Sequence, residues 1–256
     1  MSTEAPNVKA VSLSVVTVVR NDPSGLERTI ESVAAQTFRD CEYIVVDGAS
    51  TDGTLDVIRR HIAEIDAWLS ESDSGIYAAM NKGARLASGE YVLFLNAGDR
   101  FHSADTLERF FEPEPSAELL WGDCVIEKAG GGEEYDCAKD VLAHLHRQMT
   151  VSHQSLFTRR AALLARPYDE SLRIAADYDF LCERLLAGAS WEYRPLPVSR
   201  IDDRGLSARA FETSIREKRR ISLARFPAKR AQVLAYYAAL SAYMRAKLIL
   251  GGIHGR

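Results

Sequence analysis

The stretch Gly89-Glu-Tyr-Val-Leu-Phe-Leu-Asn-Ala-Gly-Asp99 decides the fold of this chain. Its run of strand formers, Tyr91 to Leu95, leaves no room for polar alternation, which is typical of a strand buried on both faces of a parallel sheet. The run ends at Asn96-Ala-Gly-Asp99, and open α/β sheets bind ligands at the carboxyl ends of their strands. We therefore expect Asp99 to hold a divalent ion against a diphosphate, with a helix-capping turn Asp as the alternative interpretation.

Apolar runs alternate with helical segments throughout the first 99 residues. The sequence predicts strands at Val11–Val19, Tyr43–Val46, Trp68–Ser70 and Tyr91–Leu95, separated by helices at about Gly25–Gln36, Thr54–Ile65 and Ile76–Ala87. Strands that alternate with helices of this length form βαβ units and a parallel sheet. This part of the chain is therefore expected to be a nucleotide-binding-like half domain.

The pattern after Asp99 is looser. It predicts a hairpin at Leu119–Glu127 and Glu133–Ala138, a strand at Ser155–Thr158, a helix at Tyr178–Ala187, a proline-containing edge segment at Trp191–Val198, and helices at Phe211–Arg225 and Ala228–Leu250. Proline cannot donate to a strand ladder, which is why Trp191–Val198 is expected at an edge. The two last helices are separated at Pro227.

Composition restricts the class of protein. A length of 256 residues fits one large α/β domain, with or without a helical appendage, and 46% hydrophobic with 27% charged residues is typical of a soluble globular protein. The chain has no recognisable signal peptide and no apolar run of 18 residues, and its four cysteines include no C-x-x-C pair. We therefore expect a cytoplasmic protein with reduced thiols.

Charge is distributed unevenly along the chain. From Arg204 onward there are 12 Lys and Arg residues against two acids, a net charge of +10, whereas the preceding 203 residues carry −14. A basic tail on an acidic body indicates a polyanionic neighbour, and the acidic body argues against nucleic acid as that neighbour.

Several common motifs are absent, and what remains is a set of acids. The loop Gly48 to Thr54 has the glycine spacing of a phosphate loop but lacks its lysine. No G-x-G-x-x-G follows a strand and no G-x-S-x-G is present, which disfavours dinucleotide oxidoreductases and the commonest serine hydrolases. The candidate acids are Asp47, Asp73, Asp99, Asp177 and Asp179. Carboxylates around one sheet edge suit metal-assisted chemistry on a phosphorylated substrate.

Ordered sequence blocks carry a resemblance to a known family. They are Val15-Val-Thr-Val-Val-Arg-Asn21, Ser32-Val-Ala-Ala-Gln-Thr-Phe38, Val46-Asp-Gly-Ala-Ser-Thr-Asp-Gly-Thr54, Ser74-Gly-Ile-Tyr-Ala-Ala-Met-Asn-Lys-Gly83 and Gly89 to Asp99, followed by His153-Gln-Ser-Leu-Phe157 and Ala176-Asp-Tyr-Asp-Phe180. In this order and spacing the chain resembles family 2 glycosyltransferases of GT-A fold, and among them the colanic-acid type of bacterial polysaccharide and glycolipid enzymes. The resemblance covers roughly residues 11–207.

The resemblance implies a fold and a domain organisation. The expected fold is α/β, with a single Rossmann-like, mostly parallel sheet, flanking helices and a C-terminal helical extension. The catalytic domain would span residues 1–207, with a nucleotide-binding half at about 11–99 and an acceptor half at about 100–207. Residues 208–256 would form a basic helical region.

The resemblance also implies an activity, an inverting transfer of a sugar from a nucleotide diphosphate to an acceptor hydroxyl. Asp177 matches the catalytic base and Asp99 the last acid of the metal motif. The implied nucleotide contacts are Thr17, Asn21, Asp47, Asp73 and Asn81. Asp179 is expected to be a solvated or structural acid, and an N-cap for the following helix is the alternative role of Asp177.

Two positions depart from the family pattern. The D-x-D-D motif is reduced to Asn96-Ala-Gly-Asp99, so Mn²⁺ or Mg²⁺ would be held mainly by Asp99, the donor diphosphate and water. Ala176 replaces the Glu that precedes the base, which leaves Asp177 without an acidic neighbour. Metal dependence is therefore expected to be weaker than a full motif would imply.

Three further residues are candidates for contact with the diphosphate or acceptor: His153, Gln154 and Arg204. For His153 a structural histidine is the alternative, and for Arg204, in a loop that could close over the diphosphate, an ordinary surface loop. A zinc site with His144 and His146 is disfavoured, because positions i and i+2 of a helix do not share a face.

The tail combines a basic segment with an apolar, tyrosine-rich helix at 231–244. This combination suits the headgroup region of an anionic leaflet, so we expect a peripheral position on the inner face of the cell membrane, near a saccharide or lipid-linked acceptor. A helix pair packed on the catalytic domain and a homodimer interface are the alternatives. For the whole protein, a sugar-1-phosphate nucleotidyltransferase and a non-catalytic nucleotide-sugar-binding scaffold also remain open.

Overall fold

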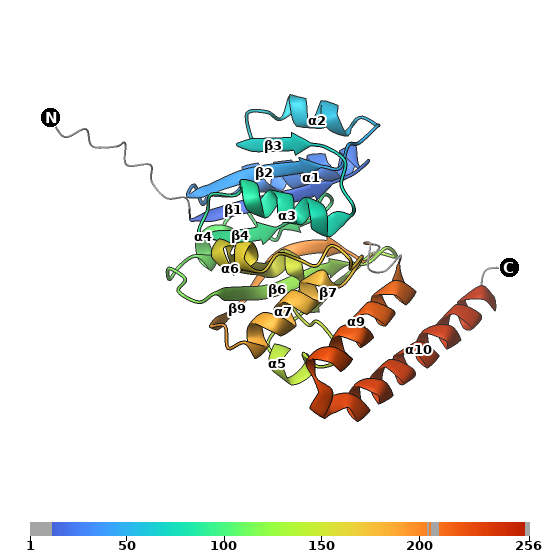
Figure 1. Ribbon diagram of the computed structural model, residues 1–256. Helices are drawn as coiled ribbons and strands as arrows, with labels where there is room; N and C mark the ends of the chain where they lie inside the picture. Colours follow the sequence, from blue (N-terminus) through green and yellow to red (C-terminus); the bar gives the residue numbers. More distant parts are fainter. Residues whose placement is uncertain (1–11, 204, 206–209, 254–256) are drawn as a thin grey trace.

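The computed structural model describes residues 12–203, 205 and 210–253 (Figure 1). Within this part of the chain one nine-stranded sheet has the order β3-β2-β1-β4-β8-β6-β9-β5, and β7 pairs with β6. The strands are β1 (Leu13–Val19), β2 (Cys41–Asp47), β3 (Ala67–Ser70), β4 (Tyr91–Phe94), β5 (Arg100–Phe101), β6 (Leu119–Glu127), β7 (Glu133–Asp136), β8 (Leu156–Arg159) and β9 (Trp191–Asp202). The helices are α1 (Pro23–Ala34), α2 (Thr54–Arg60), α3 (Ile76–Leu86), α4 (Thr106–Phe110), α5 (Val141–His144), α6 (Arg160–Ala165), α7 (Ala176–Leu186), α9 (Phe211–Arg225) and α10 (Arg230–Ile253), with 3₁₀ turns η1 (His153–Ser155) and η2 (Pro227–Lys229).

The predicted parallel half is confirmed. β1 pairs in parallel with both β2 and β4, and β2 pairs in parallel with β3. All seven residues of β1 are buried, as expected for a strand covered on both faces. The carboxyl ends of β1, β2 and β4 therefore meet at one edge of the sheet.

Helices cover both faces of the sheet. Alternate residues of β1 point to opposite sides, so that Val16 joins a core with α3, α6 and α7, whereas Val15 joins a second core with α1, α2 and α4. Each core also contains residues of β6, Trp121 in the first and Leu120 in the second. The segments before and after Asp99 are thus held together by shared cores, and Figure 1 shows α3, α6 and α7 on the same side of the sheet.

The second half of the sheet is mixed. β8 runs antiparallel to both β4 and β6, while β6 and β9 are parallel. β9 is longer than the predicted Trp191–Val198 segment and is paired on both sides at its end, where Ser199 and Arg200 meet β5. Trp121 and Asp123 of β6 pair with Tyr193 and Pro197, so β9 advances four residues where β6 advances two. This bulge accommodates the prolines.

Several boundaries differ from the prediction. α2 ends at Arg60 instead of about Ile65, and α1 begins at Pro23, with the Asp22 side chain accepting a hydrogen bond from the backbone N–H of Gly25. α7 begins at Ala176, two residues earlier than expected. Asp177 therefore lies inside the first turn and is not the N-cap, which is the position of Ala175.

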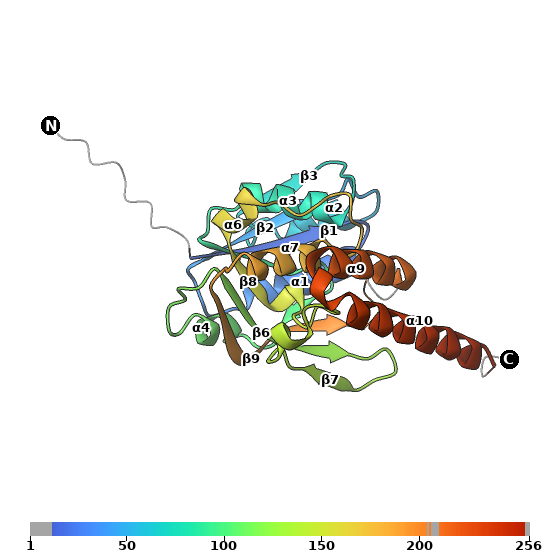
Figure 2. The same cartoon turned by 60° about the horizontal axis from the view of Figure 1, so that its bottom comes forward.

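The C-terminal helices pack on the body at one end and leave it at the other. α9 contacts α7, and Ile221 of α9 belongs to the first core. The hydroxyls of Tyr236 and Tyr237 in α10 donate to Gln148 Oε1 and Arg147 O, both at 2.7 Å. Figures 1 and 2 show α10 running past the body toward the C-terminus. Among the described helices, none combines the length and the apolar character that crossing a bilayer requires.

At the bulge, β9 approaches Gly122 so closely that no side chain fits at this position. A Cβ on Gly122 would lie 2.5 Å from the carbonyl oxygen of Leu196 and 2.6 Å from Cγ2 of Val198. We expect Gly122→Ala to lower the free energy of unfolding by about 1–3 kcal/mol, because the backbone of β9 must shift. Gly130→Ala, where a Cβ meets nothing within 4 Å, is the control for urea unfolding. Equal stability of the two variants would contradict the close approach.

Candidate functional site

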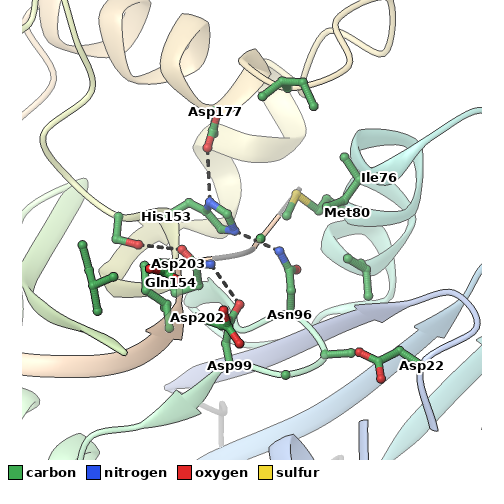
Figure 3. Close-up of a pocket in the computed structure, with 18 of the residues that line it drawn as sticks. Asp22, Ile76, Met80, Asn96, Asp99, His153, Gln154, Asp177, Asp202 and Asp203 are labelled. Carbon is green, nitrogen blue, oxygen red and sulfur yellow. Dashed lines mark hydrogen bonds and ion pairs between the residues drawn. The ribbon is translucent and has the colours of Figure 1, made fainter. Parts of the chain in front are cut away.

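A cleft of about 1170 Å³ opens at the carboxyl edge of the parallel strands (Figure 3). Asp99, from the loop after β4, and Asp177, from the first turn of α7, both line it. The two acids are 78 positions apart in the sequence, and the fold brings them into one cavity, which a base and a metal ligand acting on one substrate need.

The loop that carries Asp99 is tightly fixed. Gly98 has a φ of +96°, a left-handed conformation that favours glycine. Its N–H donates to the Thr29 hydroxyl at 3.0 Å, and that hydroxyl donates to the carbonyl oxygen of Asp99 at 2.8 Å. The Asp99 carboxylate accepts a hydrogen bond from Gln154 Nε2 at 2.9 Å. Burial raises the pKa of Asp99 to about 6, although the hydrogen bond from Gln154 acts in the opposite direction.

Asp177 is buried but is held ionised by its neighbours. The Tyr77 hydroxyl donates to Asp177 Oδ1 at 2.9 Å, and Nδ1 of His153 lies 3.2 Å from Oδ2. Burial alone would raise the pKa of Asp177, but the hydrogen bond from His153, the charge of Lys218 and the hydrogen bond from Tyr77 together lower it. The side chain is therefore an available proton acceptor at neutral pH.

One short turn connects the two acids. His153 and Gln154 are consecutive residues of η1, and each contacts one of the carboxylates. The other ring nitrogen of His153, Nε2, lies 2.9 Å from the side-chain amide of Asn96. With that amide donating to Nε2, the ring carries its proton on Nδ1 and donates it to Asp177. Figure 3 shows this chain of contacts from Asn96 through His153 to Asp177.

Helix α9 contributes to the site, which the sequence analysis did not predict. The Glu217 carboxylate is buried and accepts hydrogen bonds from three consecutive backbone N–H groups just before α7, those of Arg173, Ile174 and Ala175, at 2.9–3.2 Å. The next residue, Lys218, lines the cleft. An available signal was that Glu217 is one of only two acids among the bases of the tail.

The residues after Asp177 are also bound by α9. Ser222 Oγ lies 2.9 Å from the Tyr178 hydroxyl, and Arg225 forms two hydrogen bonds of 2.9 Å to Asp179. Arg166 makes a further ion pair with Asp179 at 3.1 Å. Asp179 is therefore a buried structural acid and is not solvated.

Two of the predicted nucleotide contacts are Asn21, in the loop after β1, and Asp47, the last residue of β2. Asn21 Oδ1 accepts from the N–H of Thr51 at 2.9 Å, which ties these loops together. Asp47 Oδ2 accepts from Ser50 N and Ser70 Oγ, whereas its Oδ1 is buried and has no hydrogen-bond partner in the structure. A buried, unpaired carboxylate oxygen is costly unless a ligand donates to it.

A third predicted contact, Asp73, lines a smaller cavity of about 360 Å³. Its Oδ1 accepts from the N–H of Gly75 at 3.0 Å. Arg20, Ile76 and Arg173 line both this cavity and the larger cleft, so the two spaces are neighbours.

The side chains of Thr17 and Asn81 form hydrogen bonds to other residues of the protein. The Thr17 hydroxyl donates to Leu95 O at 2.7 Å and accepts from Tyr43. The Asn81 side chain exchanges two hydrogen bonds of 2.9 Å with the backbone of Tyr168. Neither residue lines the cleft, and the same is true of Asn21 and Asp47. Arg204 lies outside the described residues.

The acids of the cleft could supply some, but not all, of the ligands of a divalent cation. The described residues contain no group of three or more His, Cys, Asp or Glu side chains that could hold a metal, at His144 and His146 or elsewhere. Asp202 and Asp203 line the cleft with Asp99, and the negative charge of Asp202 contributes to the raised pKa of Asp99. Two neighbouring carboxylates suit a hard ion that keeps waters and shares phosphate oxygens.

The contacts of Asp177 predict how its pKa responds to substitution. His153→Gln removes the largest of the contributions that lower this pKa, so the pKa should rise; Tyr77→Phe removes a smaller one and should raise it less. Carboxyl-detected NMR titration of the aspartates measures both shifts without any substrate. An unchanged pKa of Asp177 in His153→Gln would contradict the contact.

Comparison with known proteins identifies the family of this chain. Residues 14–119 match the model of glycosyl transferase family 2. The chain is 35% identical over 181 residues to a PGL/p-HBAD biosynthesis glycosyltransferase of Mycobacterium bovis, which covers 67% of this chain and 68% of that protein. It is 29% identical over 185 residues to chondroitin synthase of Escherichia coli, covering 69% of this chain and 27% of the synthase.

Solved structures show the same fold. S. aureus TarS in complex with UDP-GlcNAc superimposes with a TM-score of 0.69 at 20% identity, over 89% of this chain and 71% of that one. A mannosyltransferase from Pyrobaculum calidifontis in complex with GDP-Man and Mn²⁺ gives a TM-score of 0.59 at 18% identity, over 94% and 79%. The predicted GT-A fold is thereby confirmed, and the chain belongs to glycosyl transferase family 2.

Proposed function

We propose that this glycosyltransferase moves a sugar from a nucleotide-diphosphate donor to an acceptor hydroxyl with inversion at the anomeric carbon. The observation that carries the proposal is the meeting of Asp99 and Asp177 in one cleft, each held by one residue of the same turn. An inverting displacement needs a base on the acceptor side and positive charge where the diphosphate leaves.

Asp177 is the proposed base. As the acceptor oxygen bonds to the anomeric carbon, the bond from that carbon to the diphosphate breaks, the nucleotide diphosphate leaves, and the hydroxyl proton passes to Asp177. His153 and Tyr77 each contact one of its carboxylate oxygens and so fix its orientation. Because these contacts lower the pKa, the carboxylate is in its ionised form when the acceptor arrives.

Asp99, with Asp202, is proposed to hold Mg²⁺ or Mn²⁺ when the donor is bound. Such an ion neutralises charge on the departing diphosphate. The bound Mn²⁺ of the P. calidifontis neighbour supports divalent metal dependence in this fold.

The loops after β1, β2 and β3 are proposed to bind the nucleoside, with Asp47, Asp73 and Asn21 as contacts. The unpaired Oδ1 of Asp47 supports this, since a base N–H would satisfy it. The solved neighbours contain UDP-GlcNAc and GDP-Man, which supports a nucleotide-sugar donor without selecting one. The names of the relatives support an acceptor in polysaccharide or glycolipid synthesis, of the colanic-acid type or another.

Substitution of the two acids separates a transferase from a nucleotide-binding scaffold. We expect Asp177→Asn to lower kcat at least 100-fold, because proton transfer is lost, with UDP or GDP affinity nearly unchanged. Asp99→Asn should also abolish turnover while nucleotide still binds. Donor hydrolysis and transfer, screened over UDP-, GDP- and dTDP-sugars with and without Mn²⁺, provide the measurement.

Asp56→Asn, at an exposed position of α2, is the matched control for these variants. Full activity of Asp177→Asn would reject Asp177 as the base. Nucleotide binding without turnover in the wild type over the whole screen would favour the scaffold.

We further propose that α10 rests on an anionic membrane surface. Residues 218–256 contain no acid. Lys229 and Arg230 are exposed where α10 begins, and the helix exposes Leu234 (41%) and Tyr243 (64%) as it extends from the body (Figure 2). Exposed cations beside exposed apolar side chains suit a headgroup region, and this position would bring the cleft near a lipid-linked acceptor.

Vesicle binding tests the membrane proposal. The full chain should sediment with vesicles containing phosphatidylglycerol and not with pure phosphatidylcholine. The double variant Lys229→Gln/Arg230→Gln should lose roughly 2 kcal/mol of binding, at about 1 kcal/mol per cation. Equal binding to both vesicles would contradict the proposal, and a dimer that buries α10, seen by light scattering, would favour the homodimer alternative.

A further inference from the structure

Among the described residues, four cations that line the cleft form no ion pair with an acid: Arg20, Arg28, Arg173 and Lys218. Two of them are joined through Glu217: Lys218, on α9, and Arg173, in the segment before α7, both line the cavity that contains Asp177. Within the described part of the chain, neither side chain forms a hydrogen bond or an ion pair. By contrast, Arg100 and Lys128, which line the same cleft, are paired with Glu127 and Glu134.

Glu217 fixes the position of both cations. Its carboxylate binds the backbone N–H groups of Arg173, Ile174 and Ala175, so α9 is joined to the segment that precedes Asp177. Lys218 is the next residue along α9, and Arg173 is itself one of the three residues bound. The two side chains therefore project from backbone that is anchored, which is unlike the situation of surface lysines on a mobile tail.

Partial burial of the charged Lys218 side chain costs free energy when no ligand is bound. Its side chain is half-buried, and this loss of solvation lowers the pKa of its ammonium group, while the charge of Asp177 acts in the opposite direction. Among the described residues, Asp177 acts on Lys218 only through its charge, and its oxygens contact Tyr77 and His153 instead. A cation that is partly removed from water and has no acid of its own is stabilised when an anion binds beside it.

We propose that Lys218 and Arg173 form an anion subsite that binds a phosphoryl group of a substrate. The planar guanidinium of Arg173 suits bidentate binding of phosphate oxygens, and Lys218 adds a point charge. This inference rests on the proposed function, which offers two sources of the same chemistry: the diphosphate of the donor, or the phosphate of a lipid-linked acceptor.

Calorimetry on the full-length protein without turnover tests the subsite. The variants are Lys218→Gln and Arg173→Gln, and Arg219→Gln is the matched control, since Arg219 is the exposed neighbour of Lys218 on the same helix and does not line the cleft. The donor probe is UDP or GDP, compared with the nucleoside alone. The acceptor probe is geranyl diphosphate, compared with geraniol, in the presence of saturating nucleoside diphosphate.

If the donor diphosphate occupies the subsite, Lys218→Gln and Arg173→Gln each weaken binding of the nucleoside diphosphate at least fivefold and leave the nucleoside unaffected. If an acceptor phosphate occupies it, the same loss is seen for geranyl diphosphate only. Lys218→Arg should retain most of the affinity in either case, and thermal unfolding verifies that the variants are folded.

The proposed subsite is rejected if both phosphorylated probes bind Lys218→Gln and Arg173→Gln as tightly as they bind Arg219→Gln. This outcome is independent of catalysis, because binding is measured without transfer. Loss of activity in Asp177→Asn with intact anion binding, or the reverse, therefore distinguishes failure of the subsite from failure of the proposed function.

Discussion

The site depends on one constraint, the fixation of two buried carboxylates by the consecutive residues His153 and Gln154. Asp99 follows β4, and Asp177 lies in the first turn of α7, in the second half of the chain. Burying an ionised carboxylate costs free energy unless hydrogen-bond donors replace the lost water. Here each carboxylate is contacted by one residue of the same turn. A shift of η1 would therefore disturb both acids together.

The C-terminal segment belongs to the site as much as the sheet does. Glu217 satisfies three N–H groups before α7, and Arg225 pairs with Asp179 one turn further along that helix. α9 is thus bound through its middle to the segment before α7 and through its last residue to the helix that presents Asp177. The cations of the tail therefore lie in different surroundings: Arg225 pairs with Asp179, Lys218 lines the cleft, and Lys229 and Arg230 are exposed where α10 begins.

The sequence predicted the parallel half well, because periodicity and strand length are local properties. β1, β2, β3, α3 and β4 lie within a few residues of their predicted positions. The second half was less predictable: the bulge in β9 depends on its pairing with β6, and the start of α7 at Ala176 depends on the acceptor that Glu217 supplies to the preceding backbone. Thr17 and Asn81 lie in the family blocks, yet their side chains form hydrogen bonds to the backbone of Leu95 and Tyr168.

The sequence by itself determined that this is an α/β protein of the GT-A type with candidate acids at Asp47, Asp99 and Asp177, because strand periodicity and ordered motifs are written in local residue patterns. Only the tertiary structure decided that Asp99 and Asp177 share a cleft and that Lys218 faces it. These relations join segments tens of residues apart, and they follow from the pairing of strands and the docking of α9 through Glu217, which no local pattern encodes.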